Sequence, residues 1–281
     1  MSRRAPLART SVRDALDSAV IAFGAAGCDT PRLDAEILLA AAMGVSRATI
    51  VADPGRGLDP DQAWQFAEWA RRRRGREPVA YILGSKGFRR LELSVDRRVL
   101  VPRPETEHLV EAALGLPHGA RVVDVGTGSG AVALALKDER PDLEVIGVDY
   151  SEDALDVARA NARRLGLDVA LLCSDLLDPV SGPIDAVVSN PPYVGEAEQE
   201  SLPADVVRFE PSVALFAGPD GLSAIRRLIP GAVSAGARFI ALEVGSTQAA
   251  AVAGLMVAAG FTDTEVVPDL AGRERVVVGS R

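Results

Sequence analysis

The residues of this chain best suited to unusual chemistry are Asn190-Pro191-Pro192-Tyr193, which follow an apolar segment that predicts a strand. The two prolines lack an N–H group and have a fixed φ, so the loop presents carbonyl oxygens. With the side-chain carbonyl of Asn190 and the flat ring of Tyr193, they could hold a planar amino group toward an electrophile. An amide or ring-amino nitrogen needs this help because its lone pair is delocalised. The alternative is a purely structural Asn-Pro turn.

A second segment, residues 124–130 (DVGTGSG), lies between a predicted buried strand and a predicted helix. Glycines at this place let the backbone turn sharply and leave no side chain between it and a ligand. The spacing is G-x-G-x-G, which differs from the G-x-G-x-x-G of nicotinamide-binding loops. Asp124, two residues ahead of the first glycine, suits a ligand with an ammonium group near the loop. A glycine loop alone does not identify the ligand, so the residues at the neighbouring strand ends are needed to identify it.

Two further acidic residues follow predicted strands. Asp149 ends a strand at a place where a carboxylate can accept hydrogen bonds from both ribose hydroxyls of an adenosine. Ser151 already supplies the N-cap of the next helix, which favours a ligand role for Asp149. Asp175 could meet an adenine amino group while Leu176 packs on the ring, although a surface turn is the alternative for Asp175. These strand ends predict an adenosine pocket at the carboxyl edge of a sheet.

The elements that would position these residues fall into two regions. Residues 1–85 predict a helical bundle, because capping residues and prolines precede runs with helical periodicity. Residues 86–102 predict a hairpin linker, since apolar residues alternate over 91–95 and resume over 99–101. Residues 103–281 alternate strands with helices, which predicts an α/β domain whose mostly parallel sheet is covered on both faces. Seven strands are predicted, the last two antiparallel: 121–125, 145–148, 169–173, 186–188, 239–244, 264–267 and 275–278.

Charge is distributed unevenly along the 281 residues, whose net charge is −8. The first 90 residues hold 15 basic and 10 acidic side chains, whereas residues 91–281 hold 16 and 29. An acidic body makes a poor nucleic-acid binder over most of its surface. The basic first third could be a docking surface for an acidic partner. We therefore expect no stable binding to nucleic acid.

The remaining composition excludes several classes of protein. Cys28 and Cys173 have no CxxC spacing and no neighbouring histidine pair, so a disulfide framework and a zinc site lack their ligands and both cysteines are predicted in the core. The longest apolar stretch, residues 249–261, is shorter than the ~20 residues that span a bilayer, and no signal-peptide pattern follows the start of the chain. We expect a cytoplasmic monomer without a metal. His108 and His118 lie outside the glycine and proline loops and are expected to be structural or solvated.

The glycine loop together with Asp149 resembles the class I S-adenosylmethionine-dependent methyltransferases, and the loop from Asn190 to Tyr193 resembles that of their amino-group methylators. The resemblance to one family, the HemK-type glutamine methyltransferases of peptide chain release factors, runs from about residue 11 to the C-terminus. The segment RPETE, in that order with the helical N-terminal region, points to the release-factor enzymes. The segments that carry this resemblance are 31–40, 77–84, 103–107, 210–211, 220–222 and 269–275.

The resemblance implies a Rossmann-like class I fold and methylation, by S-adenosylmethionine, of the amide nitrogen (N5) of the glutamine in the Gly-Gly-Gln motif of class 1 release factors, leaving S-adenosylhomocysteine. Asn190 and Pro191 would accept hydrogen bonds from the substrate amide, Tyr193 would wall the pocket, and residues 103–107 would lie close to the cofactor. The helical domain would help to grip the release factor. The implied catalytic residues are Asn190, Pro191, Pro192 and Tyr193. The implied cofactor-binding residues are Gly126, Thr127, Gly128, Ser129, Gly130, Asp149, Asp175, Leu176 and Asn190.

Three other functions are weighed against this one. An adenine-N6 methyltransferase could use the same loop on a flipped base, but it requires a basic groove around the site, and residues 91–281 are acidic. A sister enzyme that methylates a glutamine of a ribosomal protein is disfavoured by residues 103–107. A catalytically inactive adapter is disfavoured by the intact glycine loop, Asp149 and the loop at Asn190.

Overall fold

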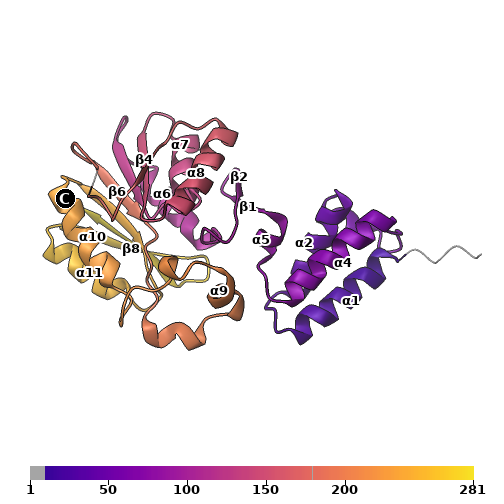
Figure 1. The fold of residues 1–281 in the computed structure, drawn as a ribbon. Coiled ribbons are helices and arrows are strands. Elements are labelled where there is room, and N and C mark those ends of the chain that lie inside the picture. The colour runs from indigo at the N-terminus through magenta and orange to yellow at the C-terminus, as the bar shows by residue number, and fades with distance from the viewer. Residues whose placement is uncertain (1–9, 179) are drawn as a thin grey trace, which may run out of the picture. The chain divides into compact units, whose positions relative to one another are not determined.

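The computed structural model describes residues 10–178 and 180–281, and their contacts divide them into two compact units (Figure 1). The first unit comprises the chain up to Gly84 together with Ala204–Phe209. The second unit comprises Ser85–Pro203 and Glu210–Arg281. No local pattern in the sequence predicts that Ala204–Phe209, a short segment beyond the Asn190–Tyr193 loop, belongs to the helical unit.

The first unit is helical because its segments begin with good capping residues and carry apolar stripes. The side chain of Ser11 accepts a hydrogen bond from the N–H of Asp14, and Asp59 and Gln62 form a reciprocal capping box. Gly44 ends its helix in the left-handed conformation. Apolar side chains from several helices share one buried core. The helices are α1 (Val12–Ala25), α2 (Pro31–Met43), α3 (Arg47–Ala52), α4 (Pro60–Arg74), α5 (Val79–Leu83) and α9 (Ala204–Phe209).

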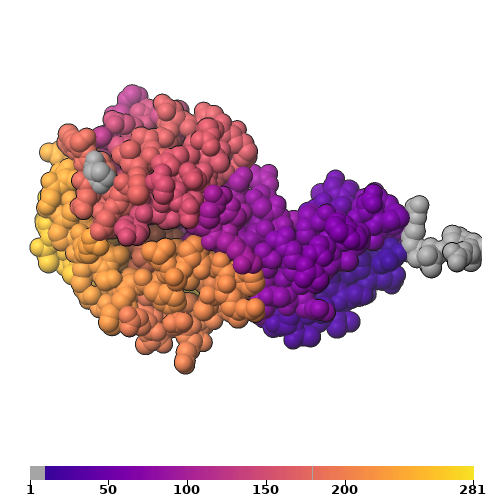
Figure 2. All heavy atoms as spheres, in the orientation of Figure 1, coloured from indigo at the N-terminus to yellow at the C-terminus, as the bar shows by residue number. Residues whose placement is uncertain are grey.

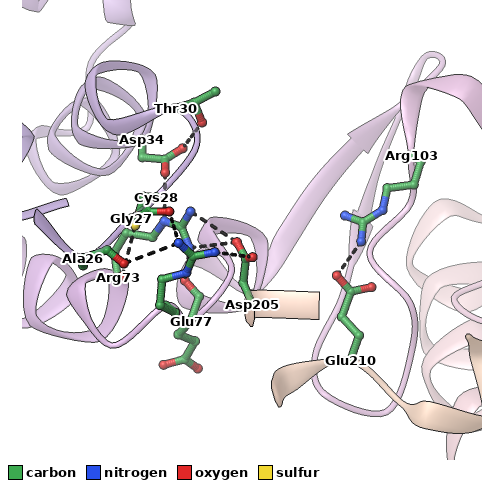
Figure 3. A network of polar contacts seen from close by, with 11 residues as sticks. Ala26, Gly27, Cys28, Thr30, Asp34, Arg73, Glu77, Arg103, Asp205 and Glu210 are labelled. Atoms are coloured by element: carbon green, nitrogen blue, oxygen red, sulfur yellow. Dashed lines mark hydrogen bonds and ion pairs between the residues drawn. The ribbon is translucent and has the colours of Figure 1, made fainter. Parts of the chain in front are cut away.

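A buried arginine ties α9 to this unit (Figure 3). Arg73, which is 4% exposed, donates to Asp34 over 2.8 Å and to Asp205 over 3.3 Å. Arg76 donates to the other oxygen of Asp205 over 3.0 Å. Burial of a guanidinium is costly unless carboxylates compensate its charge, which explains why two acidic residues converge on it. One arginine of the run at 71–74 is therefore an internal structural group and is not part of the docking surface that the basic first third could form.

The second unit is built on the predicted seven-stranded sheet, in the order β5-β4-β3-β6-β7-β9-β8. The first five strands in this order are parallel, and β9 is antiparallel to both of its neighbours. The predicted α/β architecture and antiparallel end are thus confirmed. The strands are β3 (Arg121–Val125), β4 (Glu144–Asp149), β5 (Ala170–Cys173), β6 (Ala186–Ser189), β7 (Phe239–Glu243), β8 (Asp263–Pro268) and β9 (Glu274–Ser280).

Helices cover both faces of this sheet (Figure 1). On one face, apolar strand residues pack with α10 (Ser223–Ser234) and α11 (Ala249–Ala258) in one core. Alternate strand residues point the other way. Asp124, for example, accepts a hydrogen bond from the N–H of Ala133 in α7, so α7 lies on the opposite face. The helices on that face are α6 (Glu107–Ala113), α7 (Ala131–Glu139) and α8 (Glu152–Leu165). The described residues also form the short 3₁₀ helices η1 (Pro104–Thr106), η2 (Glu196–Ser201) and η3 (Ser212–Ala214).

The predicted hairpin is present, but its strands are formed by residues other than those expected. Strands β1 (Ser85–Phe88) and β2 (Leu91–Ser94) pair across Arg89, whose φ of 52° forms the tight turn. Residues 99–101, which were expected to form its second strand, are not in a strand. Val99 and Val101 are buried nevertheless, so their apolar pattern reflects packing and not strand pairing.

Two further observations bear on the sequence analysis. Cys28 is buried as predicted, but Cys173 is exposed, because it lies at the end of β5, the edge strand of the sheet. Within residues 10–178 and 180–281, no helix is both long enough and apolar enough to cross a membrane.

Candidate active site

The glycine loop joins β3 to α7 and depends on glycine's freedom at positive φ. Gly126 and Gly128 have φ of 74° and 55°, values that a residue with a Cβ atom adopts only with strain. The N–H groups of Gly126 and Thr127 both donate to the carbonyl of Val148, at 2.8 and 2.9 Å. These bonds fix the loop against the end of β4. Gly130 also has a positive φ, of 83°, and a Cβ atom there would in addition lie 2.9 Å from the side chain of Leu134 in α7.

Asp124 supports this loop from inside the protein. Its carboxyl group is 1% exposed and accepts hydrogen bonds from the hydroxyl of Thr127 (2.7 Å) and the N–H of Ala133 (3.1 Å). Burial raises the pKa of this carboxyl to about 7, against the opposing effect of the two hydrogen bonds. Asp124 does not line the pocket described below, so its geometry differs from the ligand-facing acid that the sequence suggested.

Asp149 lies at the end of β4 and faces the glycine loop. One carboxylate oxygen accepts from the N–H of Gly128 at 2.8 Å, and the other accepts from the N–H of Ser151 at 2.9 Å. Ser151 caps α8 through its side chain, as predicted. Burial raises the pKa of Asp149, and the backbone hydrogen bonds oppose this increase. Each oxygen still has a lone pair available, so the carboxylate can accept further hydrogen bonds from a ligand.

Asp175 and Leu176 follow β5 at the same edge of the sheet. The Asp175 carboxylate forms an ion pair with Arg227 of α10 (2.7 Å), a partner that the sequence did not suggest. Leu176 adopts a left-handed conformation with φ of 59°. Both residues, together with Arg227, line one pocket with Asp149. The ion pair leaves the carboxylate half-exposed, so it can still meet a polar group of a ligand.

These strand ends surround a pocket of about 380 Å³, which lies within the second unit where the red and orange parts of the chain meet (Figure 2). Its size is that of a site for a small organic ligand. The structure brings most of the predicted site residues to this pocket: Gly126, Gly128, Asp149, Asp175, Leu176, Asn190, Pro191 and Pro192. Four other predicted residues do not line it: Thr127, Ser129, Gly130 and Tyr193. Thr127 and Ser129 are buried, which is compatible with a contribution from their backbone.

The proline loop follows β6 on the side of the pocket next to the glycine loop. The Ser189 hydroxyl donates to the carbonyl of Val125 at 2.6 Å, which links the ends of β6 and β3. Asn190 donates from Nδ2 to the hydroxyl oxygen of Thr106 at 3.0 Å. The Tyr193 hydroxyl donates to Glu243 at 3.3 Å, and the Tyr193 carbonyl accepts from Gln248 at 2.9 Å. Both ends of the loop are therefore held by side chains from other elements.

Residues 103–107 lie beside this loop and not in a separate part of the unit. Arg103 forms an ion pair with the buried Glu210 (Figure 3). Glu210 also accepts from the N–H of Val101. Thr106, three residues on, contacts Asn190 as described above. The two histidines are outside the site. His108 pairs with Glu111, and His118 is exposed.

Glu243, which was not among the residues predicted from the sequence, lies beside the proline loop. It is 1% exposed at the end of β7 and contacts both Thr106 and Tyr193. The signal was present, because an acidic residue ends an otherwise apolar strand at the edge where ligands bind. In the part of the chain that the structure describes, no cluster of three or more acidic, His or Cys side chains could hold a metal ion.

Known proteins resemble this chain over both units. The family described as "PrmC N-terminal domain" matches residues 14–84, and the family "Methyltransferase small domain" matches residues 105–208. The chain is 42% identical to the release factor glutamine methyltransferase of Koribacter versatilis over 96% of its own length and 99% of that protein. It is 43% identical to the enzyme of that name from Caulobacter vibrioides, over 90% and 91%. A methyltransferase structure from Pyrococcus furiosus shares the fold, with a TM-score of 0.52 at 17% identity over 68% of this chain and 88% of that one.

Proposed function

We propose that this chain, which belongs to the family of release factor glutamine methyltransferases, transfers a methyl group from S-adenosylmethionine to the amide nitrogen of a release-factor glutamine. The acceptor is the glutamine of the Gly-Gly-Gln motif in class 1 peptide chain release factors. One observation carries the proposal. A single pocket is lined by the glycine loop and Asp149 together with Asn190-Pro191-Pro192.

The pocket residues fit the proposed cofactor. Gly126 and Gly128 present backbone without side chains, and the two oxygens of Asp149 can accept hydrogen bonds from ribose hydroxyls. Leu176 offers an apolar surface for a purine ring, and Asp175 a carboxylate for its amino group. When bound, S-adenosylmethionine would supply an electrophilic methyl group on a sulfonium. Thr127, Ser129 and Gly130 would act by holding the shape of the loop.

The proline loop would bind and orient the substrate amide. The side-chain oxygen of Asn190 and the backbone carbonyl of Pro191 would accept its two hydrogens, and Pro192 would keep the loop rigid. Both hydrogen bonds strengthen as the amide nitrogen acquires positive charge during methyl transfer, which lowers the barrier. Tyr193, which is held through its hydroxyl and its carbonyl, would form one wall of the region that binds the substrate glutamine.

The helical unit would contribute binding of the protein substrate. Its exposed apolar side chains include Ile21 and Trp64, at 73% and 68% exposure. Aromatic side chains exposed in this way are common anchors in protein interfaces. We propose that the enzyme acts as a monomer in the cytoplasm, where its substrate functions in translation termination.

The first prediction tests this function directly. The purified protein, labelled S-adenosylmethionine and a release factor should give one modified glutamine by peptide mass mapping. Asn190→Ala should lower kcat by about 100-fold or more, because a hydrogen bond that strengthens in the transition state is lost. The cofactor Kd, measured by calorimetry, should stay within about threefold.

The control is a release factor whose Gly-Gly-Gln glutamine is replaced by alanine, which should accept no label. Equal turnover by the wild-type enzyme and Asn190→Ala would contradict the mechanism. Methylation of single-stranded or duplex DNA in preference to the release factor would contradict the substrate and favour an adenine-N6 methyltransferase.

A further inference from the structure

A buried chain of hydrogen bonds runs from the end of β7 to the proline loop. Oε2 of Glu243 accepts from the Thr106 hydroxyl at 2.6 Å, and Oε1 accepts from the Tyr193 hydroxyl at 3.3 Å. The Thr106 oxygen in turn accepts from Nδ2 of Asn190 at 3.0 Å. Thr106 is 5% exposed and Glu243 is 1% exposed, so water cannot readily replace either partner. The chain therefore links a residue that does not line the pocket to one that does.

When Glu243 is ionised, the chemistry of these groups fixes the direction of every hydrogen bond. An ionised carboxylate has no proton to donate, so Glu243 can only accept. The single hydroxyl proton of Thr106 must then point to Glu243, and the Thr106 oxygen can only accept from Asn190. An asparagine amide has a donating and an accepting end that are nearly identical in shape, so its orientation is set by its partners. Its NH₂ end must face Thr106.

We propose that Glu243 and Thr106 are positioning residues that fix the amide orientation of Asn190, so that its oxygen is presented to the NH₂ group of the substrate glutamine. The inference rests on the proposed function, because it assigns a purpose to the free end of Asn190. Neither residue touches the reacting atoms. Glu243 acts through Thr106, and Thr106 acts through Asn190.

The opposite orientation of Asn190 would oppose the reaction. Its NH₂ group would face the NH₂ group of the substrate, and two donors cannot form a hydrogen bond. The repulsion would grow as the substrate nitrogen becomes positive during methyl transfer. A mixture of both orientations would thus lower kcat, whereas binding of the cofactor to the glycine loop and Asp149 would not change.

The protonation state of Glu243 offers an independent test. Burial raises the pKa of Glu243 to about 7, against the hydrogen bonds from Thr106 and Tyr193 and the charge of Arg275, while Glu105 raises it further. A protonated Glu243 can donate to Thr106, which frees Thr106 to donate to Asn190 and removes the constraint. The carboxylate is therefore the productive form, and kcat should rise as the pH passes through about 7.

Three variants test the direction of the chain. Thr106→Val keeps the shape but removes the hydroxyl, and we expect kcat to fall by about tenfold or more. Thr106→Ser restores the hydroxyl and should keep kcat within about threefold of the wild type. Glu243→Gln can donate or accept, so it permits both orientations of Asn190; kcat should fall by about tenfold, and the rise in kcat near pH 7 should disappear.

Each variant is measured for kcat, KM for the release factor and cofactor Kd, and the Kd should stay within about twofold. The matched control is Thr264→Val in β8, the edge strand of the sheet, which should leave kcat unchanged. The inference would be overturned if Thr106→Val kept the wild-type kcat, or if Thr106→Val and Thr106→Ser lowered kcat equally. If Thr106→Val fails to fold, the kcat of Glu243→Gln decides, since a wild-type kcat in that variant would overturn the inference. A wild-type enzyme that does not methylate the release factor would instead overturn the proposed function.

Discussion

At the scale of single residues, two carboxylates near the same sheet edge, those of Asp124 and Asp149, have different tasks. Asp124 is buried under the glycine loop and is satisfied by Thr127 and Ala133. Asp149 accepts from two backbone N–H groups and also faces the pocket. Burial and partners, and not residue type, thus separate an acid that supports the loop from one that faces the pocket.

Asp149 should therefore affect both the loop and the cofactor. In Asp149→Asn one oxygen becomes an NH₂ group, which cannot accept from the N–H of Gly128 or Ser151 or from a ribose hydroxyl. We expect the Kd for S-adenosylmethionine, measured by calorimetry, to rise about tenfold or more. Asp156→Asn, an exposed substitution on α8, is the matched control and should bind like the wild type. An unchanged Kd in Asp149→Asn would exclude a role for Asp149 in binding.

At the scale of elements, the position of the proline loop depends on a distant turn. Gly221 has φ of 72°, and a Cβ atom on it would lie 2.1 Å from the carbonyl oxygen of Tyr193. It would also lie 2.7 Å from Nε2 of Gln248, the group that donates to this carbonyl. The sequence marked residues 220–222 through the family resemblance alone. The structure gives the physical reason, since only glycine lets the turn pack against the end of the loop.

Gly221→Ala should accordingly displace Tyr193. The contact at 2.1 Å involves backbone, which cannot move aside as a flexible side chain can, and the positive φ adds strain. We expect kcat to fall by about tenfold or more and the melting temperature to drop. Gly254→Ala in α11, where a Cβ atom meets nothing within 4 Å, should instead stabilise the protein by about 0.5–1 kcal/mol. Wild-type turnover by Gly221→Ala would show that this turn does not position the loop.

At the scale of the whole molecule, chain order and compact units do not coincide. Residues 204–209 follow the proline loop in sequence but belong to the helical unit by their contacts. Asp205 of this segment meets Arg73 and Arg76, which are more than a hundred residues away in the chain. Such a contact cannot be read from local periodicity, because its partners are brought together by packing alone.

Asp205→Asn should loosen α9 specifically. The substitution removes the charge that compensates two partly buried guanidinium groups, and hydrogen bonds to charged groups contribute about 1.5–3 kcal/mol each. We expect faster amide hydrogen exchange in α9 and a smaller increase in α4, where Arg73 keeps its bond to Asp34. Asp17→Asn, an exposed change in α1, serves as the control. Unchanged exchange in α9 would mean that these ion pairs do not hold it.

Much of the fold and of the candidate site could be predicted because the signals are local. Strand and helix periodicity predicted the seven strands and the antiparallel end, and turn residues marked the loops at strand ends. The hairpin was misplaced because the buried Val99 and Val101 carry an apolar pattern without pairing in a strand. Cys173 was misplaced because the sequence does not tell an edge strand from a central one.

The sequence by itself determined which residues lie at the strand ends around the pocket, since Asp149 and Asn190-Pro191-Pro192 each follow a strand whose pattern is evident. The tertiary structure alone decided which side chains orient them. Thr106 and Glu243 are separated by 137 residues and meet only because α6, which directly follows η1, packs against β7 in the folded unit. Long-range hydrogen bonds form between groups that are buried side by side, and burial is a property of the packed chain and not of the local sequence.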